Sequence, residues 1–281
     1  MQHKLLKILS FISIVGITSC EKIDLRSAFI SYQTVNERFE ESMQWNKKNP
    51  LKEIKTSNEE YTIFIMGDSH IGGVENYQLF TKNAIQSKAL ALVMVGDITT
   101  GRVKDYETLS QNIPPKDSIA SFLMVGNHEI YFDGWKEFYA RFGSSTYYFR
   151  VETPEASDLF ICLDSGSGTL GDKQMQWLKN LLKSKREYYR YCIVFTHVNF
   201  FRTRHTGSTN PVIEELQTLM DLFYTYNVNS VIMGHDHIKS IEKLGNTSYI
   251  TLDALLDGFS QAGYLELIIN NQSANYKFVN L

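Results

Sequence analysis

Five short apolar runs, each followed by polar side chains that can bind a metal ion, constrain this chain more than any other feature. The runs occupy residues 61–66, 91–95, 121–125, 191–196 and 230–233. They are short for helices, and their continuous β-branched and aromatic residues are typical of strands buried on both faces. In an open α/β sheet, ligands bind at the carboxyl ends of such strands. The five runs could therefore deliver polar side chains to one crevice.

The polar residues after these runs have the types and spacing of metal ligands. They are Asp68 and His70, then Asp97, then Asn127 and His128, then His197, and finally His235 and His237. In extended backbone, residues i and i+2 point to the same side, so Asp68 with His70, and His235 with His237, can each present two side chains together. Carboxylate, imidazole and amide ligands without a thiolate suit Zn, Fe, Mn or Ni better than a structural Cys-rich zinc site.

The motifs in this order resemble the calcineurin-like metallophosphoesterase family. They read Gly-Asp-Ser-His at 67–70, Gly-Asp at 96–97, Gly-Asn-His-Glu at 126–129, His at 197 and Gly-His-Asp-His at 234–237. The resemblance covers residues 61–252. One such pair would mean little, but five in order, each after a predicted strand, form a specific pattern. The resemblance implies an α/β fold of two packed mixed β-sheets flanked by helices, a four-layer sandwich.

The resemblance also implies a dinuclear metal centre and assigns its ligands. One ion would be bound by Asp68, His70, Asp97 and His237, and the other by Asp97, Asn127, His197 and His235. Asp97 would bridge two ions about 3.5–4 Å apart, and a hydroxide between them would attack phosphorus in line. His128 would be catalytic, stabilising the transition state or protonating the leaving oxygen. Glu129 or Asp236 could orient neighbouring imidazoles, although Asp236, like Ser69, is more simply a spacer.

Two further groups have both a functional and a structural interpretation. Tyr131, Phe132 and Trp135 follow His128 and could stack on a leaving group, but packing is the simpler interpretation. The loop after His197 contains Arg202, Arg204 and His205. Its arginines could bind a phosphate bidentately, or the loop could be a solvated face.

The first 60 residues are interpreted as an export signal and a tether. Residues 1–19 combine basic Lys4 and Lys7 with a short apolar stretch, which is typical of a signal peptide. The sequence Ile-Thr-Ser-Cys at 17–20 resembles a bacterial lipoprotein processing box. It implies cleavage before Cys20, a lipid anchor on that residue and a location outside the cytoplasm; the alternative is an ordinary secretory peptide. Residues 20–60 are expected to be a tether with one helix at 28–45, and 61–281 the metallophosphoesterase domain.

The rest of the chain alternates predicted strands and helices, as expected for sheets covered by helices. Helices are expected at 75–88, 103–111, 134–142, from a cap at Asp172 to 187, and at 211–226 with Pro211 in the first turn. Further strands are expected at 147–151, 159–163, 239–243, 247–252, 264–269 and 274–279. Cys162 and Cys192 are expected to be buried thiols, and whether they pair is open.

The predicted function is hydrolysis of small phosphate mono- or diesters outside the cytoplasm. A net charge of −3 gives no indication of nucleic-acid binding. The sequence after Asp97, Ile-Thr-Thr-Gly, lacks the Asp-Arg pair of protein Ser/Thr phosphatases, which argues against that class. The alternatives are a pyrophosphohydrolase of nucleotide-linked lipid, a non-catalytic protein stabilised by metal, and, most remotely, a metal-free fold. Substrate, native metals and oligomeric state are left open.

Overall fold

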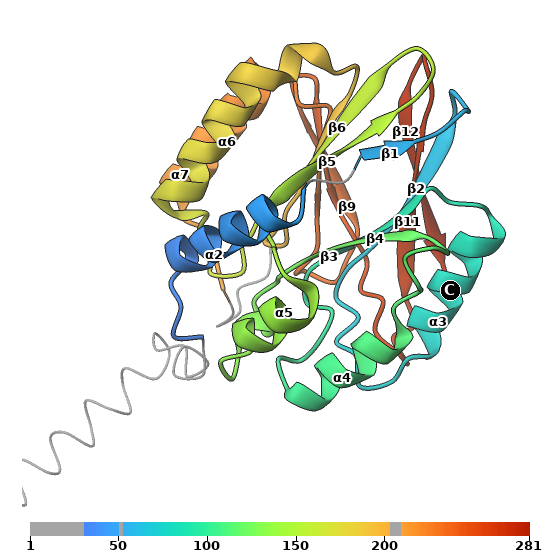
Figure 1. Ribbon diagram of the computed structural model, residues 1–281, viewed down its shortest axis with the longest axis vertical. Helices are drawn as coiled ribbons and strands as arrows, with labels where there is room; N and C mark the ends of the chain where they lie inside the picture. Colours follow the sequence, from blue (N-terminus) through green and yellow to red (C-terminus); the bar gives the residue numbers. More distant parts are fainter. Residues whose placement is uncertain (1–30, 51–52, 203–208) are drawn as a thin grey trace, which may run out of the picture.

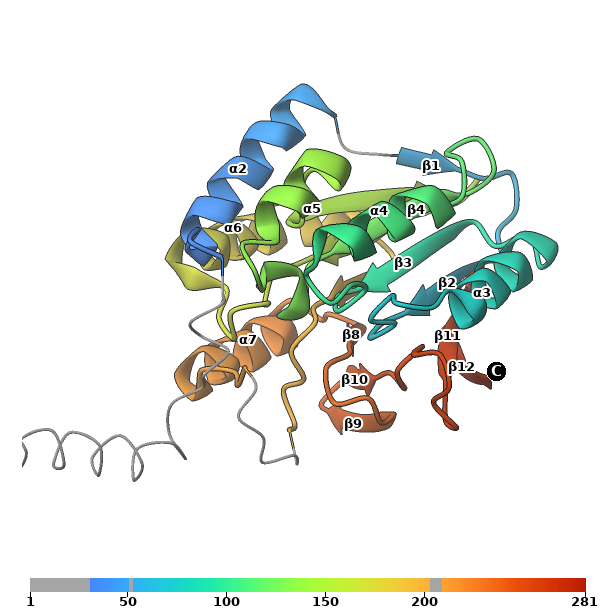
Figure 2. The same cartoon turned by 90° about the horizontal axis from the view of Figure 1, so that it is seen from below.

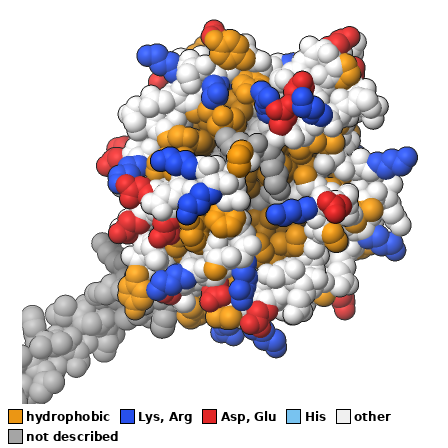
Figure 3. Space-filling view, viewed as in Figure 1, with side chains coloured by type: hydrophobic (Ala, Val, Ile, Leu, Met, Phe, Trp, Pro, Cys, Tyr) orange, Lys and Arg blue, Asp and Glu red, His pale blue; other side chains and the backbone are white. Residues whose placement is uncertain are grey.

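The computed structural model describes residues 31–50, 53–202 and 209–281. The predictions for the signal peptide, Cys20, Arg204 and His205 fall outside these residues. Within the described ranges, no helix is both long and apolar enough to cross a membrane. On the face shown in Figure 3, basic and acidic side chains are interspersed with hydrophobic ones.

Two mixed β-sheets form the centre of the protein, as the sequence predicts (Figures 1 and 2). The five-stranded sheet has the order β12 (Ala274–Asn280), β11 (Gly263–Ile269), β2 (Tyr61–Met66), β3 (Ala91–Val95) and β4 (Ala120–Met124). The seven-stranded sheet has the order β1 (Glu53–Lys55), β5 (Tyr147–Glu152), β6 (Ser157–Cys162), β7 (Cys192–Phe195), β8 (Ser230–Met233), β10 (Thr247–Thr251) and β9 (Ser240–Leu244).

The strands that precede the metal-ligand motifs run parallel within each sheet. In one sheet β2 pairs with β3 and β3 with β4, and in the other β7 pairs with β8. Their carboxyl ends therefore reach the same edge, and the bridge between Gly67 and Ala254 joins the two sheets at that edge. The antiparallel pairs involve β5, β9, β11 and β12. The topology thus brings the five motifs together although they span 170 residues of sequence, from 68 to 237.

Helices cover the outer faces of both sheets (Figure 1). The five-stranded sheet is covered by α3 (Glu75–Gln86), α4 (Val103–Asn112) and α5 (Trp135–Phe142), and the other sheet by α6 (Gly171–Lys185) and α7 (Ile213–Thr225). Alternate residues of β2 show why its run is continuously apolar: Ile63 packs between the sheets, whereas Phe64 packs under the helices. Each such buried side chain contributes about 1.5–3 kcal/mol of transfer free energy.

Several predicted element boundaries are wrong, each for a local reason. The N-terminal helix α2 is Val35–Lys48 rather than 28–45, because Thr34 and Glu37 form a capping box that starts it. Asp172 lies in the first turn of α6 and does not cap it; the Leu170 amide donates to Glu215 Oε1 instead, at 2.7 Å. Helix α7 starts after Pro211, at Ile213. Strand β1 was not predicted, and it extends the seven-stranded sheet by pairing with β5.

Cys162 and Cys192 are both buried free thiols in the described structure. They lie on adjacent parallel strands, but Cys162 faces the layer between the sheets and Cys192 faces the layer under α6 and α7. Because their side chains point to opposite faces of one sheet, the two thiols do not form a disulfide in this fold.

Candidate metal centre

The predicted ligands follow the carboxyl ends of five strands in strained backbone. Five of the seven have positive φ angles: Asp68 (53°), His70 (41°), Asp97 (49°), His235 (75°) and His237 (62°). Residues other than glycine rarely adopt this conformation, which costs about 1–3 kcal/mol each, and such residues cluster at functional sites. The extended backbone assumed for Asp68 with His70 and for His235 with His237 is therefore wrong. The two side chains of the first pair nevertheless lie together, with ligand atoms within 4.8 Å of each other.

Asp68, His70 and His237 form one cluster, which we call the first half-site. Their ligand atoms lie within 4.8 Å of one another. Nε2 of His237 is 3.3 Å from Asp68 Oδ1 and 3.2 Å from His70 Nε2. Oδ2 of Asp68 accepts a hydrogen bond from the His235 amide at 2.9 Å. Oδ1 is buried, and no hydrogen-bond partner for it exists among the described residues.

Asn127, His197 and His235 form a second cluster beside Asp97, which we call the second half-site. Nε2 of His197 lies 3.2 Å from Asp97 Oδ2 and 3.2 Å from Asn127 Oδ1. Ligand atoms of Asp97, His197 and His235 lie within 4.8 Å of one another.

Two backbone carbonyls fix which imidazole nitrogens can bind an ion. His197 Nδ1 is 2.8 Å from Val95 O, and His235 Nε2 is 2.9 Å from Thr209 O. Because a carbonyl only accepts, both of these ring nitrogens must carry a proton. The nitrogens left for an ion are Nε2 of His197 and Nδ1 of His235, and an imidazole held in this way is a well-oriented ligand.

Asp97 lies between the two half-sites, as expected for a bridging ligand. Its Oδ2 is 3.2 Å from His197 Nε2 on one side and 4.0 Å from His70 Nε2 on the other. Oδ1 accepts a hydrogen bond from the His128 amide at 2.8 Å. The His128 ring faces the same point, with Nε2 3.9 Å from Asp97 Oδ2, and it packs against the His70 ring with centroids 4.4 Å apart.

Both site carboxylates are held in the charged form. Burial by itself would raise the pKa of Asp97, but the positive charge of His197, with a further electrostatic contribution from His128, holds it well below its usual value. Burial opposes ionisation of Asp68 too, and the adjacent His237 together with the charge of His197 lowers its pKa. The site therefore presents two anionic groups to a cation.

The buried imidazoles differ in protonation. Burial alone would lower the pKa of His197, yet the neighbouring Asp97 raises it to about 9. Burial lowers the pKa of His128 to about 4, and that of His235 to about 4 with a further contribution from the charge of His197. In the ion-free chain His197 thus carries the compensating positive charge, and a bound cation would replace its proton.

Glu129 supports the loops of the centre through their backbone, rather than orienting an imidazole. Its Oε2 accepts hydrogen bonds from the amides of Asp97 at 2.7 Å and Gly126 at 2.8 Å. Its Oε1 accepts from the amide of Thr99 at 2.7 Å and from its hydroxyl at 3.0 Å. Burial, followed by the charge of Asp97, raises the pKa of Glu129 to about 7. The sequence indicated a supporting role for Glu129 but not its partners.

Asp236 and Ser69 are not mere spacers. Asp236 forms an ion pair with Arg202 at 3.1 Å and accepts a hydrogen bond from Asn199 Nδ2 at 3.1 Å, which ties the loop after β7 to the loop after β8. Arg202 also donates to Asn210 Oδ1, and its side chain is only 7% exposed, so it does not belong to a solvated face. Ser69 is buried and donates to Ile98 O at 3.0 Å.

Of the aromatic residues after His128, Tyr131 and Trp135 are buried against the protein, and the Arg102 guanidinium lies over the Phe132 ring. Trp135 is fully buried and packs beneath α2, where its indole donates to Glu41. Phe132 is half exposed. Tyr131 is buried against the His128 ring, and its hydroxyl accepts a hydrogen bond from Asn127 Nδ2 at 3.0 Å. This contact turns Asn127 Oδ1 toward His197, a positioning role that the sequence did not indicate.

Two glycines let the loops approach the ligands closely. A Cβ atom at Gly126 would lie 2.2 Å from Asp97 Oδ1, and one at Gly234 would lie 2.4 Å from Asp68 Oδ2. Any side chain at these positions would displace a carboxylate of the centre, which explains glycine in both motifs.

These observations test whether the residues fit metal ions. The donor set combines carboxylates, imidazoles and one amide oxygen, which suits borderline and hard cations. Asp68 Oδ1 is buried without a hydrogen bond among the described residues, and Nε2 of His70 and Nε2 of His237 lie beside it, 3.2 Å apart. A cation shared by these three atoms would stabilise the arrangement. The residues therefore fit the cofactor that the sequence implies.

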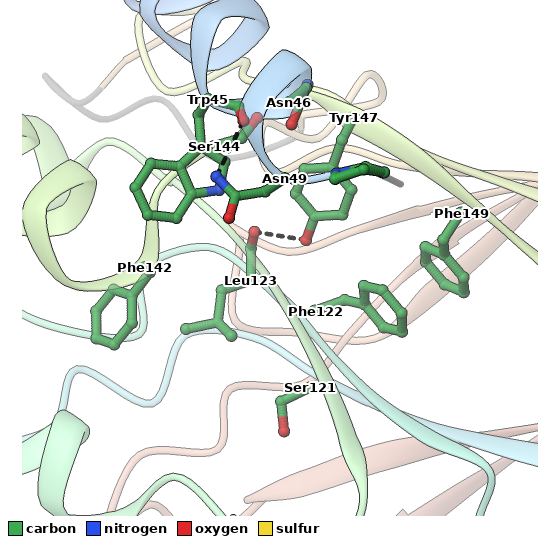
Figure 4. Close-up of a pocket in the computed structure, with 11 residues that line it drawn as sticks. Trp45, Asn46, Asn49, Ser121, Phe122, Leu123, Phe142, Ser144, Tyr147 and Phe149 are labelled. Atoms are coloured by element: carbon green, nitrogen blue, oxygen red, sulfur yellow. Dashed lines mark hydrogen bonds between the residues drawn. The ribbon is translucent and has the colours of Figure 1, made fainter. Parts of the chain in front are cut away.

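A separate pocket of about 130 Å³ lies at the end of α2 and is not part of this centre (Figure 4). Its described lining includes the aromatic residues Trp45, Phe142, Tyr147 and Phe149, and it contains no predicted ligand. The Tyr147 hydroxyl donates to Leu123 O at 2.8 Å across it.

The fold and this centre define a metallophosphoesterase. The sequence profile of the calcineurin-like phosphoesterase family matches residues 61–239, a range that includes all seven predicted ligands and His128. The chain therefore belongs to the calcineurin-like phosphoesterase family and is, by class, a metal-dependent phosphoester hydrolase. No curated protein matches the sequence significantly.

Solved structures share the fold at low sequence identity. A dimetal phosphatase from Danio rerio is similar with a TM-score of 0.63 and 12% identity, over 78% of this chain and 96% of that one. A purple acid phosphatase from yellow lupin (Lupinus luteus) seeds has a TM-score of 0.63 and 16% identity, over 80% of this chain and 52% of that one. GAP50, the anchor in the inner membrane complex of Plasmodium, has a TM-score of 0.62 and 14% identity, over 79% and 85%.

Proposed function

We propose that this protein hydrolyses small phosphate mono- or diesters with two metal ions, one in each half-site. The observation that carries the proposal is the convergence of six other predicted ligands around Asp97, whose Oδ2 lies between His197 Nε2 and His70 Nε2. The dimetal phosphatase of similar fold is consistent with it.

In this proposal the chain holds the reacting groups, and the ions complete the chemistry. Asp68, His70, Asp97 and His237 would hold one ion, and Asp97, Asn127, His197 and His235 the other. The chemistry that two cations supply there is neutralisation of the phosphoryl oxygens and activation of a water nucleophile near neutral pH. Val95 O and Thr209 O hold the ligand imidazoles in the required tautomers, which keeps the centre preorganised.

His128 is the residue proposed to act on the leaving group. Its Nε2 lies 3.9 Å from Asp97 Oδ2, and its side chain is 28% exposed, so a substrate can contact it. The lowered pKa of His128, caused first by burial, makes the ring neutral in the ion-free chain at pH 7. A neutral ring still offers one N–H to a leaving oxygen, and the negative charge of a bound phosphate would favour its protonated form.

The proposed place of action is outside the cytoplasm, through a lipid on Cys20. The support for this is the lipoprotein-type motif at 17–20. Mass spectrometry of membrane-extracted protein should find diacylglycerol on Cys20 at the start of the mature chain. A soluble product from which Cys20 has been removed would contradict the anchor.

The activity is tested with a monoester, a diester and a nucleotide diphosphate ester, each with added Mn²⁺ and after removal of metal by a chelator. The proposal expects metal-dependent hydrolysis of the monoester or the diester, lost in Asp97→Asn. Cleavage confined to the diphosphate ester would favour the pyrophosphohydrolase. Binding of two ions without turnover of any ester would favour a non-catalytic protein.

A further inference from the structure

The N-terminal helix α2 lies outside the residues that match the family, yet its side chains form hydrogen bonds with loops that adjoin the metal centre. Helix α2 lies beside α5 and α6 (Figures 1 and 2). The Phe39 and Trp177 rings, and the Trp45 and Tyr139 rings, pack with centroids 6.2 Å and 5.8 Å apart. The family match starts only at residue 61.

One side chain of α2 forms a buried ion pair with the loop that follows β6. Arg38 Nε and Nη2 donate to the two carboxylate oxygens of Asp164, at 2.8 and 3.1 Å. The two side chains are 0% and 1% exposed. Nη2 also donates to Ser167 Oγ at 3.0 Å. A bidentate pair of this kind fixes the orientation of the Asp164 carboxylate and also compensates its charge.

The same loop holds a ligand of the second half-site. Ser165 follows Asp164 directly, and its Oγ accepts hydrogen bonds from the amides of His197 and Val198, both at 3.0 Å. The loop also packs on the Asn127 motif, because a Cβ at Gly166 would lie only 2.6 Å from Gly126 O. Arg38 is thus connected to His197 through Asp164 and Ser165.

A second connection leads from α2 to Asn127. Ser42 Oγ accepts a hydrogen bond from the Ser145 amide at 3.3 Å, and Ser145 Oγ accepts one from the Val125 amide at 2.9 Å. Val125 precedes Gly126 and Asn127 at the end of β4. The first connection thus reaches His197 itself, and the second reaches Val125, two residues before Asn127.

We propose that α2 supports the second half-site and that Arg38 is a positioning residue for His197, acting through Asp164 and Ser165. The inference rests on the two-ion centre proposed above. Groups that orient metal ligands typically change metal affinity by about 10–100-fold when they are replaced. Arg38→Lys should therefore weaken the ion of the second half-site, because a lysine keeps the charge but forms only one of the two carboxylate bonds.

The chain offers a matched control for a purely structural role. Arg190 also forms a bidentate pair, donating to Asp158 at 2.6 and 3.1 Å, and the Asp158 side chain is 0% exposed. This pair lies at the start of β6 and β7, whereas the metal ligands follow the carboxyl ends of the strands. Arg190→Lys should lower the melting temperature and leave both metal affinities unchanged.

The experiment is a Mn²⁺ titration of the ion-free chain, with melting temperatures measured on the same samples. His235→Ala removes a ligand of the second half-site and identifies which dissociation constant belongs to it. For Arg38→Lys we expect that constant to rise by about 10–100-fold, with the constant of the first half-site unchanged. Ser165→Ala should also weaken only the ion of the second half-site, and it tests the inference if Arg38→Lys does not fold.

Unchanged affinities in folded Arg38→Lys, or in Ser165→Ala, would overturn the inference. So would an equal loss of affinity in Arg190→Lys at a similar melting temperature, because general destabilisation would then explain it. A wild-type chain that binds fewer than two ions would instead overturn the proposed function, so the two failures are distinguishable.

Discussion

Replacing Tyr131 by phenylalanine tests whether a single hydroxyl fixes the ligand oxygen of Asn127. The Tyr131 hydroxyl accepts a hydrogen bond from Asn127 Nδ2 at 3.0 Å, while Asn127 Oδ1 lies 3.2 Å from His197 Nε2. Without the hydroxyl, the amide nitrogen loses this hydrogen bond and the amide is held less firmly in its orientation. The amide can then turn its nitrogen, which is no metal ligand, toward the second half-site.

The expected size of the effect follows from one buried, neutral hydrogen bond. Such a bond contributes about 0.5–1.5 kcal/mol, which corresponds to a factor of about 2 to about 10 in affinity. We therefore expect Tyr131→Phe to weaken the ion of the second half-site by this factor and to leave the ion of the first half-site unchanged. Calorimetric titration of the ion-free chain with Mn²⁺ measures both constants.

Tyr147→Phe is the matched control for this variant. Tyr147 also loses one buried hydroxyl contact, at 2.8 Å to Leu123 O, but it lines the separate pocket at the end of α2. It should lower stability by a similar amount without changing either metal affinity. Equal effects of the two variants, or an unchanged second constant in Tyr131→Phe, would refute the reasoning.

Two other predictions concern His128 and the thiols. His128→Ala keeps the backbone amide that donates a hydrogen bond to Asp97 Oδ1, so both ions should stay bound. If His128 is a proton donor, the hydrolysis rate of this variant should fall modestly on nitrophenyl esters and by about 10²–10⁴-fold on alkyl esters, measured in parallel. Equal losses of rate on both esters, together with loss of metal, would leave His128 a structural role. Burial raises the pKa of Cys192 to about 12 and raises that of Cys162 as well. The thiolate is the reactive form, so at pH 8 a thiol reagent should modify both residues only after unfolding, as peptide mass spectrometry would show; labelling of the folded chain would contradict their burial.

The strands and the candidate ligands could be predicted because their signals are local. A continuous apolar run such as that of β3, which is buried at every position, is typical of a strand covered on both faces. Asp97 follows that run after one glycine, and parallel pairing then brings it to the same edge as Asp68. The five motifs therefore predict a candidate site without knowledge of the strand order.

The supporting contacts could not be predicted, because they join residues far apart in sequence or involve backbone atoms. Arg38 and Asp164 are separated by 126 positions. The contacts of Val95 O and Thr209 O involve backbone atoms, so the residue types do not indicate them. The left-handed backbone of His70 could not be predicted either, because histidine rarely adopts this conformation. Asp172 had the right residue type for a cap, but Glu215, from another helix, binds the Leu170 amide at the start of α6.

The central claim is that two ions, bridged by Asp97, are needed for hydrolysis. The most direct measurement is a titration of the ion-free chain with Mn²⁺, in which bound ions per chain and the rate of ester hydrolysis are recorded at each step. We predict two ions per chain, a rate that rises with the second ion, and loss of both in Asp97→Asn, because a neutral amide is a poor bridge between cations. Full activity with one ion per chain, or two tightly bound ions and normal turnover in Asp97→Asn, would contradict it.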